Sequence, residues 1–233
     1  MSQLAAPPGF DGFNLQDVAT YGYRGERWNF VEGEALAGIV QKLNKEQNRY
    51  AINPATTRLV WRTLPFYMGA TLVRTTDMSW RPFGITSFFI GVRGQYRRMD
   101  GSKKLIEHIN ERMPLKLTAQ NVAEYLRFYC FFVRAHGRPF IIVEAIEDIG
   151  LCEPPLNEAQ IARITPELHP ITLVADKGPE GFSLSATIRY NDMLFSCIFN
   201  ITQRGQVSMV EDHVQGVYVP IGPAHSVAAA WSD

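Results

Sequence analysis

The most apolar part of the chain, Leu117–Ile149, predicts a helix, a turn and a strand. Apolar residues recur through Val122–Val133 at intervals of three and four, which is the spacing of one buried helix face. Thr118 is suited to cap this helix, and Gly137 is a natural stop. Towards its end the helix is apolar on nearly all sides, so we expect it to run into the core.

The strand that follows, Phe140–Ile146, is apolar on both faces and is interrupted by Glu144. Strands of this kind usually lie inside a covered sheet. A buried carboxylate needs a partner, and burial without one raises its pKa. Two interpretations of Glu144 have equal weight: a catalytic acid or base, or a structural role, either in an ion pair with Arg127 or Arg134 or at an edge position of the sheet.

The remaining pattern alternates short helices with strands. Apolar stripes and caps predict helices over residues 34–47, 103–111 and 157–164, with Ser102 and Asn157 as N-caps. Clusters of β-branched and aromatic residues predict strands over 59–62, 66–75 and 87–99. Strict alternation over Phe182–Tyr190 opens a closing β-meander, with later strands at 193–201, 206–210 and 214–219.

These elements predict an α+β protein in which helices pack on one face of a curved, mostly antiparallel sheet that ends in a β-meander. A long apolar helix leading into antiparallel strands resembles the cystatin/NTF2-type arrangement. That resemblance implies a fold and nothing about a substrate.

An internal echo suggests an alternative, a duplicated helix-plus-meander. Phe66–Leu72 (FYMGATL) is similar to Phe182–Ile188 (FSLSATI), and Arg93-Gly94-Gln95 recurs as Arg204-Gly205-Gln206. Short strand and turn sequences also recur by chance. The separation between the two matched segments differs between the two halves of the chain, so chance is the favoured explanation.

The domain prediction follows the same pattern. Residues 1–30 are rich in aromatics without periodicity, which predicts an arm that packs on the body. Residues 31–222 form one α+β domain, with 31–115 and 116–222 as its halves if the chain is duplicated. Residues 223–233 are expected to be a flexible tail.

Composition favours a folded cytoplasmic protein. Apolar residues make up 46% and charged residues 20% of the chain, and 23 basic residues balance 23 acidic ones. The neutral balance gives no reason to expect nucleic acid as a partner. Cys130, Cys152 and Cys197 are scattered, as reduced thiols are. We expect no membrane span and no signal peptide.

No catalytic or nucleotide-binding signature is present, so we expect no cofactor and no metal. The strongest local hint is basic: Arg93, Arg97, Arg98, Lys103 and Lys104 fall within a dozen residues. Lysines in the first turn of a helix repel its exposed N–H groups unless an anion lies there. These residues form a hypothetical anion-binding corner, and a solvated strand end is the plainer explanation.

A second hint is Glu211-Asp212-His213 in the last part of the meander. Alternation along a strand places Glu211 and His213 on one side and Asp212 on the other. His213 is therefore a candidate for acid–base chemistry, and a polar strand end is the favoured alternative.

Two function classes remain. The first is a non-enzymatic module that binds a partner protein or a small ligand in the concavity between helix and sheet. The second is a small acid–base hydrolase or isomerase that uses Glu144 or His213. A filled core with exposed apolar surface favours the first, and a deep pocket with a buried titratable group favours the second. A homodimer is compatible with either.

Overall fold

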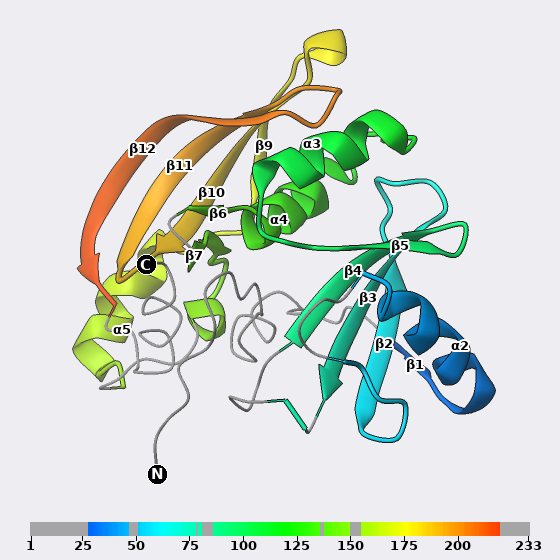
Figure 1. The fold of residues 1–233 in the computed structure, drawn as a ribbon. Helices are drawn as coiled ribbons and strands as arrows, with labels where there is room; N and C mark the ends of the chain where they lie inside the picture. Colours follow the sequence, from blue (N-terminus) through cyan, green and yellow to red (C-terminus); the bar gives the residue numbers. More distant parts are fainter. Residues whose placement is uncertain are drawn as a thin grey trace.

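Two antiparallel sheets lie on either side of a central helix (Figure 1). The structure is a computed structural model that describes residues 28–46, 51–77, 79–80, 86–135, 138–149 and 155–219. Most of the predicted N-terminal arm, the predicted tail and Cys152 lie outside the described residues.

The first sheet, here called the N-terminal sheet, is a meander of five strands in sequence order. Its strands are β1 (Asn29–Val31), β2 (Thr57–Thr63), β3 (Ala70–Asp77), β4 (Thr86–Val92) and β5 (Gln95–Arg98). The single strand expected over 87–99 is a hairpin instead. Arg93 and Gly94 adopt φ angles of 50° and 77°, which reverse the chain between β4 and β5.

The second sheet, here called the C-terminal sheet, has the strand order β12-β11-β10-β8, and β9 also pairs with β10. Its strands are β8 (Ile141–Ile142), β9 (Thr172–Asp176), β10 (Phe182–Tyr190), β11 (Met193–Ile201) and β12 (Val207–Tyr218). The bounds predicted for β10 and β11 are confirmed. β12 is one strand where two were expected, because two register shifts let it follow the full length of β11.

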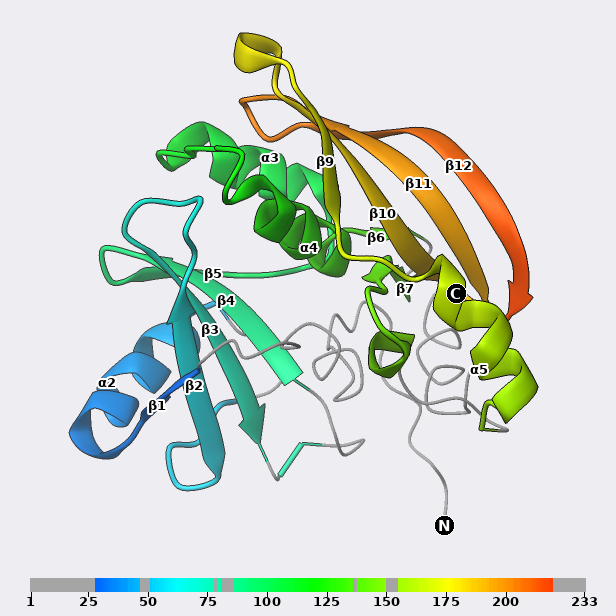
Figure 2. The ribbon, with the colours of Figure 1, turned by 180° about the vertical axis from the view of Figure 1, so that it is seen from behind.

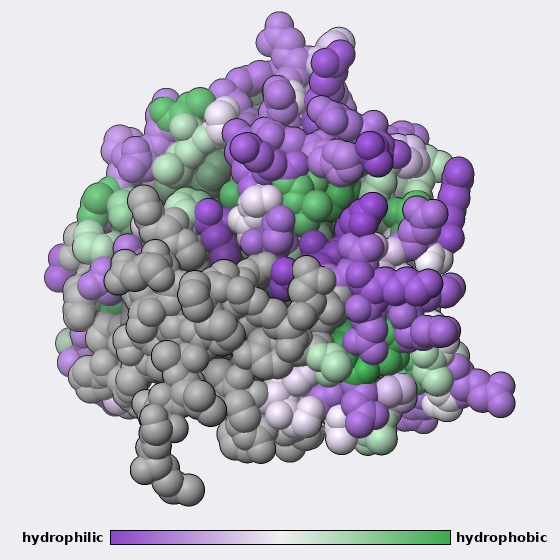
Figure 3. Space-filling model, viewed as in Figure 1, coloured by the Kyte–Doolittle hydropathy of each residue, from purple (hydrophilic) through white to green (hydrophobic). Residues whose placement is uncertain are grey.

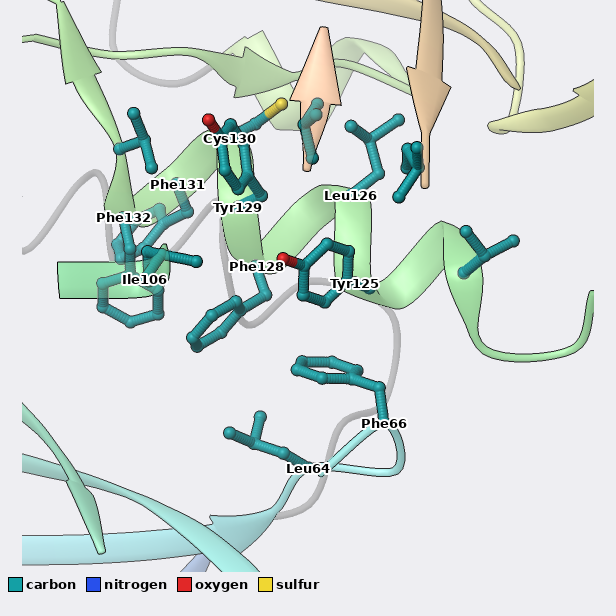
Figure 4. Close-up of a cluster of buried hydrophobic side chains, with 14 of the residues drawn as sticks. Leu64, Phe66, Ile106, Tyr125, Leu126, Phe128, Tyr129, Cys130, Phe131 and Phe132 are labelled. Carbon is teal, nitrogen blue, oxygen red and sulfur yellow. The ribbon is translucent and has the colours of Figure 1, made fainter. Parts of the chain in front are cut away.

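Helix α4 (Val122–Phe132) lies between the two sheets (Figures 1 and 2). On one side its Phe131 and Phe132 rings lie 5.6 Å and 5.1 Å from the ring of Phe88 in β4. Figure 4 shows Phe128 pointing towards Phe66, whereas Cys130 points towards the strands of the C-terminal sheet. The expectation that this helix is buried on nearly all sides is confirmed.

Both ends of α4 differ from the prediction. Asn121 precedes its first residue, and the Thr118 N–H donates to Asn121 Oδ1 at 2.8 Å, so Thr118 is not the N-cap. The helix ends at Phe132, before Gly137, because the Arg134 N–H donates to the Gly101 carbonyl instead of continuing the helix. Arg134 begins the short strand β6 (Arg134–Ala135), which pairs with β7 (Arg138–Pro139).

The strand predicted over 140–146 is shortened to β8 for an identifiable reason. The Asp148 carboxylate accepts hydrogen bonds from the backbone N–H groups of Glu144 and Ala145, each at 2.9 Å. These bonds bend the chain out of the sheet and into the short 3-10 helix η1 (Ile146–Ile149).

The other helices cover the remaining apolar surfaces. They are α2 (Gly33–Leu43), α3 (Lys103–Arg112) and α5 (Glu158–Ile164). Two 3-10 turns come after α5 in the chain, η2 (Thr165–Glu167) and η3 (Gly178–Glu180). α3 lies beside α4, and α2 covers the opposite face of the N-terminal sheet, where a second apolar core forms. The predicted caps Ser102 and Asn157 are confirmed. Within the described ranges, no helix is long and apolar enough to cross a membrane.

The α+β class, with antiparallel strands and a closing meander, is confirmed. Apart from the short β6–β7 pair, the strands are divided between two sheets, and α4 provides apolar contacts to both. The resemblance to the cystatin/NTF2-type arrangement stays a prediction.

The internal echo falls on corresponding places of the two meanders. The first copy leads into β3 and the second lies in β10, and each Arg-Gly turn joins the next two strands. Gly94 and Gly205 have φ angles of 77° and 75°. This correspondence is compatible with duplication and with chance, so both alternatives stay open.

Candidate functional site

Glu144 is buried and fully engaged in hydrogen bonds. Its carboxylate accepts from Arg127 Nε at 3.0 Å and Nη2 at 2.6 Å, and from the Ile171 backbone N–H at 2.9 Å. Arg127 belongs to α4, and Ile171 precedes β9, so one carboxylate ties the central helix to two parts of the C-terminal sheet. Of the two expected partners, Arg127 forms the ion pair.

His213 lies on β12 and is exposed. Its register partner on β11 is Ser196, whereas Asp212 pairs with Cys197, so Glu211 and His213 share one side of the strand as expected. Glu144 follows β8, three strand spacings away from β12, or about 14 Å. The structure therefore does not bring the two candidate acid–base residues together.

The predicted basic corner is distributed over β5 and its flanks. Arg93 lies in the turn before β5, and Lys103 and Lys104 follow its other end. Arg97 forms hydrogen bonds with both Glu46 carboxylate oxygens, at 2.9 Å and 3.1 Å. Lys103 lies 3.6 Å from Glu107 one helical turn along. Arg98 is half-buried on β5, beside Phe89 of β4.

A different group of charged residues lies on the inner side of the N-terminal sheet. Here Arg62 of β2 forms an ion pair with Glu124 of α4, and the Arg62 side chain is 7% exposed. Glu124 is followed one turn later by Arg127, whose partner is Glu144. Two ion pairs thus cross α4 and link the two sheets. Burial raises the pKa of the Glu124 carboxyl, although Arg62 and Arg127 act in the opposite direction.

We call the surface formed by Arg58, Arg62, Arg74, Trp28 and Phe30 the arginine face. The strand register places Phe30 beside Val60, Val60 beside Arg74, and Arg74 beside Phe88, so these side chains share the sheet face that α4 covers in part. The Arg74 and Arg62 guanidinium carbons lie 4.7 Å and 5.8 Å from the centre of the Trp28 ring. That of Arg58 lies 4.8 Å from the centre of the Phe30 ring.

The charges on the arginine face are only partly balanced. In the described part of the chain, neither Arg58 nor Arg74 has a carboxylate partner. Arg74 is half-buried, and burial together with repulsion from Arg58 lowers the pKa of its guanidinium. Two buried polar atoms on this side, Trp28 Nε1 and Thr86 Oγ1, also lack a hydrogen-bond partner among the described residues.

A polar hollow of about 660 Å³ lies between the end of α3 and the turn from β11 to β12. Asn110, which lines this hollow, belongs to a chain of hydrogen bonds: the Tyr67 hydroxyl donates to Asn110 Oδ1, Asn110 Nδ2 donates to the Tyr125 hydroxyl at 2.8 Å, and that hydroxyl donates to the Gly205 carbonyl at 2.6 Å. Burial raises the pKa of both phenols, so they stay protonated and serve as fixed hydrogen-bonding groups.

The outer edge of the C-terminal sheet carries exposed apolar side chains. Met209, Val210 and Val214 of β12 are 45%, 50% and 54% exposed. We call the segment from Met209 to Val214 the β12 edge. β12 pairs with β11 on one side, and no described strand pairs with its other side. Figure 3 shows apolar surface on the side of the molecule where β12 lies in Figure 1.

Sequence reasoning missed Arg58, Arg62, Arg74 and the role of Glu124. One signal was available: Arg62 ends the strand predicted over 59–62, and Arg58 immediately precedes it, so a strand longer by one residue would place both arginines on one face. Their approach to Arg74 depends on the register between β2 and β3, which local patterns do not determine.

In the described ranges, no group of three or more His, Cys, Asp or Glu side chains is arranged to hold a metal ion. Comparisons of the chain with protein-family models, with curated proteins and with solved structures find no match.

Proposed function

We propose that the protein is a non-enzymatic interaction module that binds an extended segment of a partner protein along the β12 edge. The observation that carries this proposal is a 12-residue strand with one unpaired side in the described structure and three exposed apolar side chains within six residues. A free strand edge binds extended peptides through backbone hydrogen bonds, and its side chains select the sequence.

The interior supports a binding role over the acid–base alternative. The aromatic side chains of α4 are buried in the apolar core between helix and sheet, as we expect for a module that binds its partner on an outer surface. Glu144 uses its carboxylate to hold three segments together. The acid–base hypothesis stays a prediction without geometric support.

The charges on the β12 edge indicate the chemistry of the partner. Glu211 and Asp212 are exposed in the middle of the segment, and Val214 follows on the same face as Asp212. A partner strand with Lys or Arg opposite the carboxylates and an apolar residue opposite Val214 would complement this edge. In a twofold pairing that sets Glu211 against His213, two Asp212 carboxylates would face each other, so a second copy is the less suited occupant.

A linear peptide library displayed on phage tests this proposal. Wild-type protein should enrich peptides in which basic and apolar residues alternate, and such peptides should protect the amides of residues 211–214 from hydrogen exchange. Val214→Lys should abolish the enrichment, since the lysine removes the apolar contact and repels the basic residues of the enriched peptides. We also propose a cytoplasmic location for the protein. Cys130 and Cys197 are free thiols, and thiols stay reduced in the cytoplasm.

The matched control is Val174→Lys on β9, at the opposite edge of the same sheet, where the valine is 57% exposed. It should leave the enrichment unchanged. No enrichment by the wild-type protein, or loss with Val174→Lys and not with Val214→Lys, would refute a β12 site. A concentration-dependent dimer that Val214→Lys dissociates would identify a second copy as the occupant instead.

A further inference from the structure

The arginine face carries an excess of positive charge. It belongs to the N-terminal sheet, whereas the β12 edge belongs to the C-terminal sheet. It presents three guanidinium groups, and in the described part of the chain Glu124 is its single carboxylate partner, at Arg62. Arg58 and Arg74 contact aromatic rings and no carboxylate described by the structure. Two unit charges on this face are therefore left without a counter-charge among the described residues.

The aromatic contacts orient these arginines without occupying their hydrogen-bond donors. A guanidinium that lies over a ring uses its flat face for the cation–π contact. Its N–H groups point outward in the plane of the group, in the fork that matches a phosphate or a carboxylate. Trp28 and Phe30 contact Arg74 and Arg58 through their rings, and neither arginine donates a side-chain hydrogen bond in the described structure, so the donors of both remain available.

The burial of Arg74 is informative because ordinary surface arginines are solvated. Arg74 is half-buried between Val60 and Phe88 in the strand register, with Arg58 close enough to repel it. Removing a cation from water costs free energy unless an anion or other acceptor compensates. The unpartnered Trp28 Nε1–H beside Arg74 is a further donor, and Thr86 Oγ1 is a further polar group on this side.

We infer that the arginine face binds an oxyanion carried by a small molecule, a phosphate or a carboxylate, through the in-plane N–H groups of Arg58 and Arg74. Arg62 forms an ion pair with Glu124, so it contributes positive potential to the site rather than hydrogen bonds to the anion. Nucleic acid suits the surface less well, since Trp28 and Phe30 already stack on arginines and the chain has no net charge.

Inorganic phosphate is the first probe, and citrate is the second. Thermal unfolding and isothermal titration are measured at constant ionic strength, with sodium chloride as the balancing salt, because screening alone changes exposed charges. Phosphate should raise the unfolding midpoint of the wild-type protein more than chloride does, with saturation. Comparison with citrate separates a phosphate-selective site from a carboxylate-selective one.

Arg74→Gln should weaken phosphate binding about tenfold or more, since it removes a charge-assisted hydrogen bond. Arg74→Lys keeps the positive charge but lacks the planar pair of N–H donors. Its affinity for phosphate should therefore lie between those of the wild type and of Arg74→Gln. Arg58→Gln, at an exposed position, provides a second variant that leaves the core untouched. The matched control is Arg112→Gln at the exposed end of α3, which should bind like the wild type.

The Lys103→Gln/Lys104→Gln double variant tests the predicted corner in the same titration. Binding that is lost with Arg74→Gln and kept with the lysine variant supports the arginine face. Binding that is lost with the lysine variant alone would assign the anion to the corner and overturn the inference. Equal effects of phosphate and chloride on the wild-type protein would also overturn it. None of these outcomes depends on peptide binding at the β12 edge.

Discussion

The ion pair between Glu144 and Arg127 offers the sharpest test of what holds the molecule together. Glu144→Gln keeps the size of the side chain and removes its charge. The variant amide has one oxygen to offer where the carboxylate serves two Arg127 nitrogens and the Ile171 N–H. At least one of these three donors therefore loses its acceptor.

The magnitude follows from burial. Removing one partner of a buried pair costs about 3–5 kcal/mol. The Glu144 side chain is 6% exposed and Arg127 is 34% exposed, so water recovers part of the loss on the arginine side. We expect a fall of about 2–4 kcal/mol in the free energy of unfolding. For a chain of this length that corresponds to a midpoint lower by about 5–12 °C.

Urea denaturation followed by far-UV circular dichroism measures this change, with an unchanged m value as the check that the states compared are the same. Glu107→Gln is the control, because its pair with Lys103 is 3.6 Å long and exposed on both sides. It should cost less than about 0.5 kcal/mol. A Glu144→Gln variant within 1 kcal/mol of the wild type would refute a structural role. Unchanged stability with altered ligand binding would revive the acid–base hypothesis.

Three further predictions follow from the described contacts. Gly205→Ala should lower the free energy of unfolding, measured by urea denaturation, by about 2–4 kcal/mol. The φ angle of Gly205 is 75°, and a Cβ there would lie 2.5 Å from Asn110 Nδ2 and from the Tyr125 hydroxyl oxygen. Gly178→Ala is the control and should cost less, because its φ is also positive but a Cβ would meet open space. Burial of Asp77 acts to raise its pKa, but hydrogen bonds from Ser79, Thr57 and Thr56 outweigh it and lower that pKa to about 2. The stability that Asp77 contributes is therefore complete above about pH 4 and lost as the pH falls towards 2, and Asp77→Asn should abolish this part of the acid dependence of urea midpoints. Burial raises the pKa of the Cys197 thiol to about 12 and also raises that of Cys130, so in a Cys152→Ser variant Ellman's reagent should modify two thiols only after denaturant is added; rapid modification of the native protein would contradict their burial.

Features set by short-range patterns could be predicted from the sequence. The spacing of Val122, Tyr125, Leu126 and Tyr129 identifies the central helix, because a helix face depends on neighbours three and four residues away. Alternation identifies β10, and the caps Ser102 and Asn157 act on donors within three residues. The partner of Glu144 lies 17 residues earlier, in the helix predicted just before its strand, which is near enough for both candidates to be named.

Features that depend on how distant segments meet could not be predicted. Arg62 and Glu124 are 62 residues apart, and each looks like an ordinary surface charge in its own strand or helix. The division into two sheets depends on which strands pair, and a strand carries little information about its neighbour beyond its apolar face. The bend at Glu144 was missed for a local reason, since it depends on the Asp148 carboxylate, which the apolar pattern of the strand concealed.

The position of α4 also determines how the molecule can come apart. The helix supplies Phe131 and Phe132 to the face of the N-terminal sheet and Leu126 and Cys130 to the C-terminal sheet, within one apolar core. Neither sheet keeps a complete inner surface once this helix leaves, so damage on one side is transmitted to the other. Heat or denaturant should therefore melt both sheets in one cooperative transition, with the same midpoint whether a probe reports on Trp61 or on Tyr190.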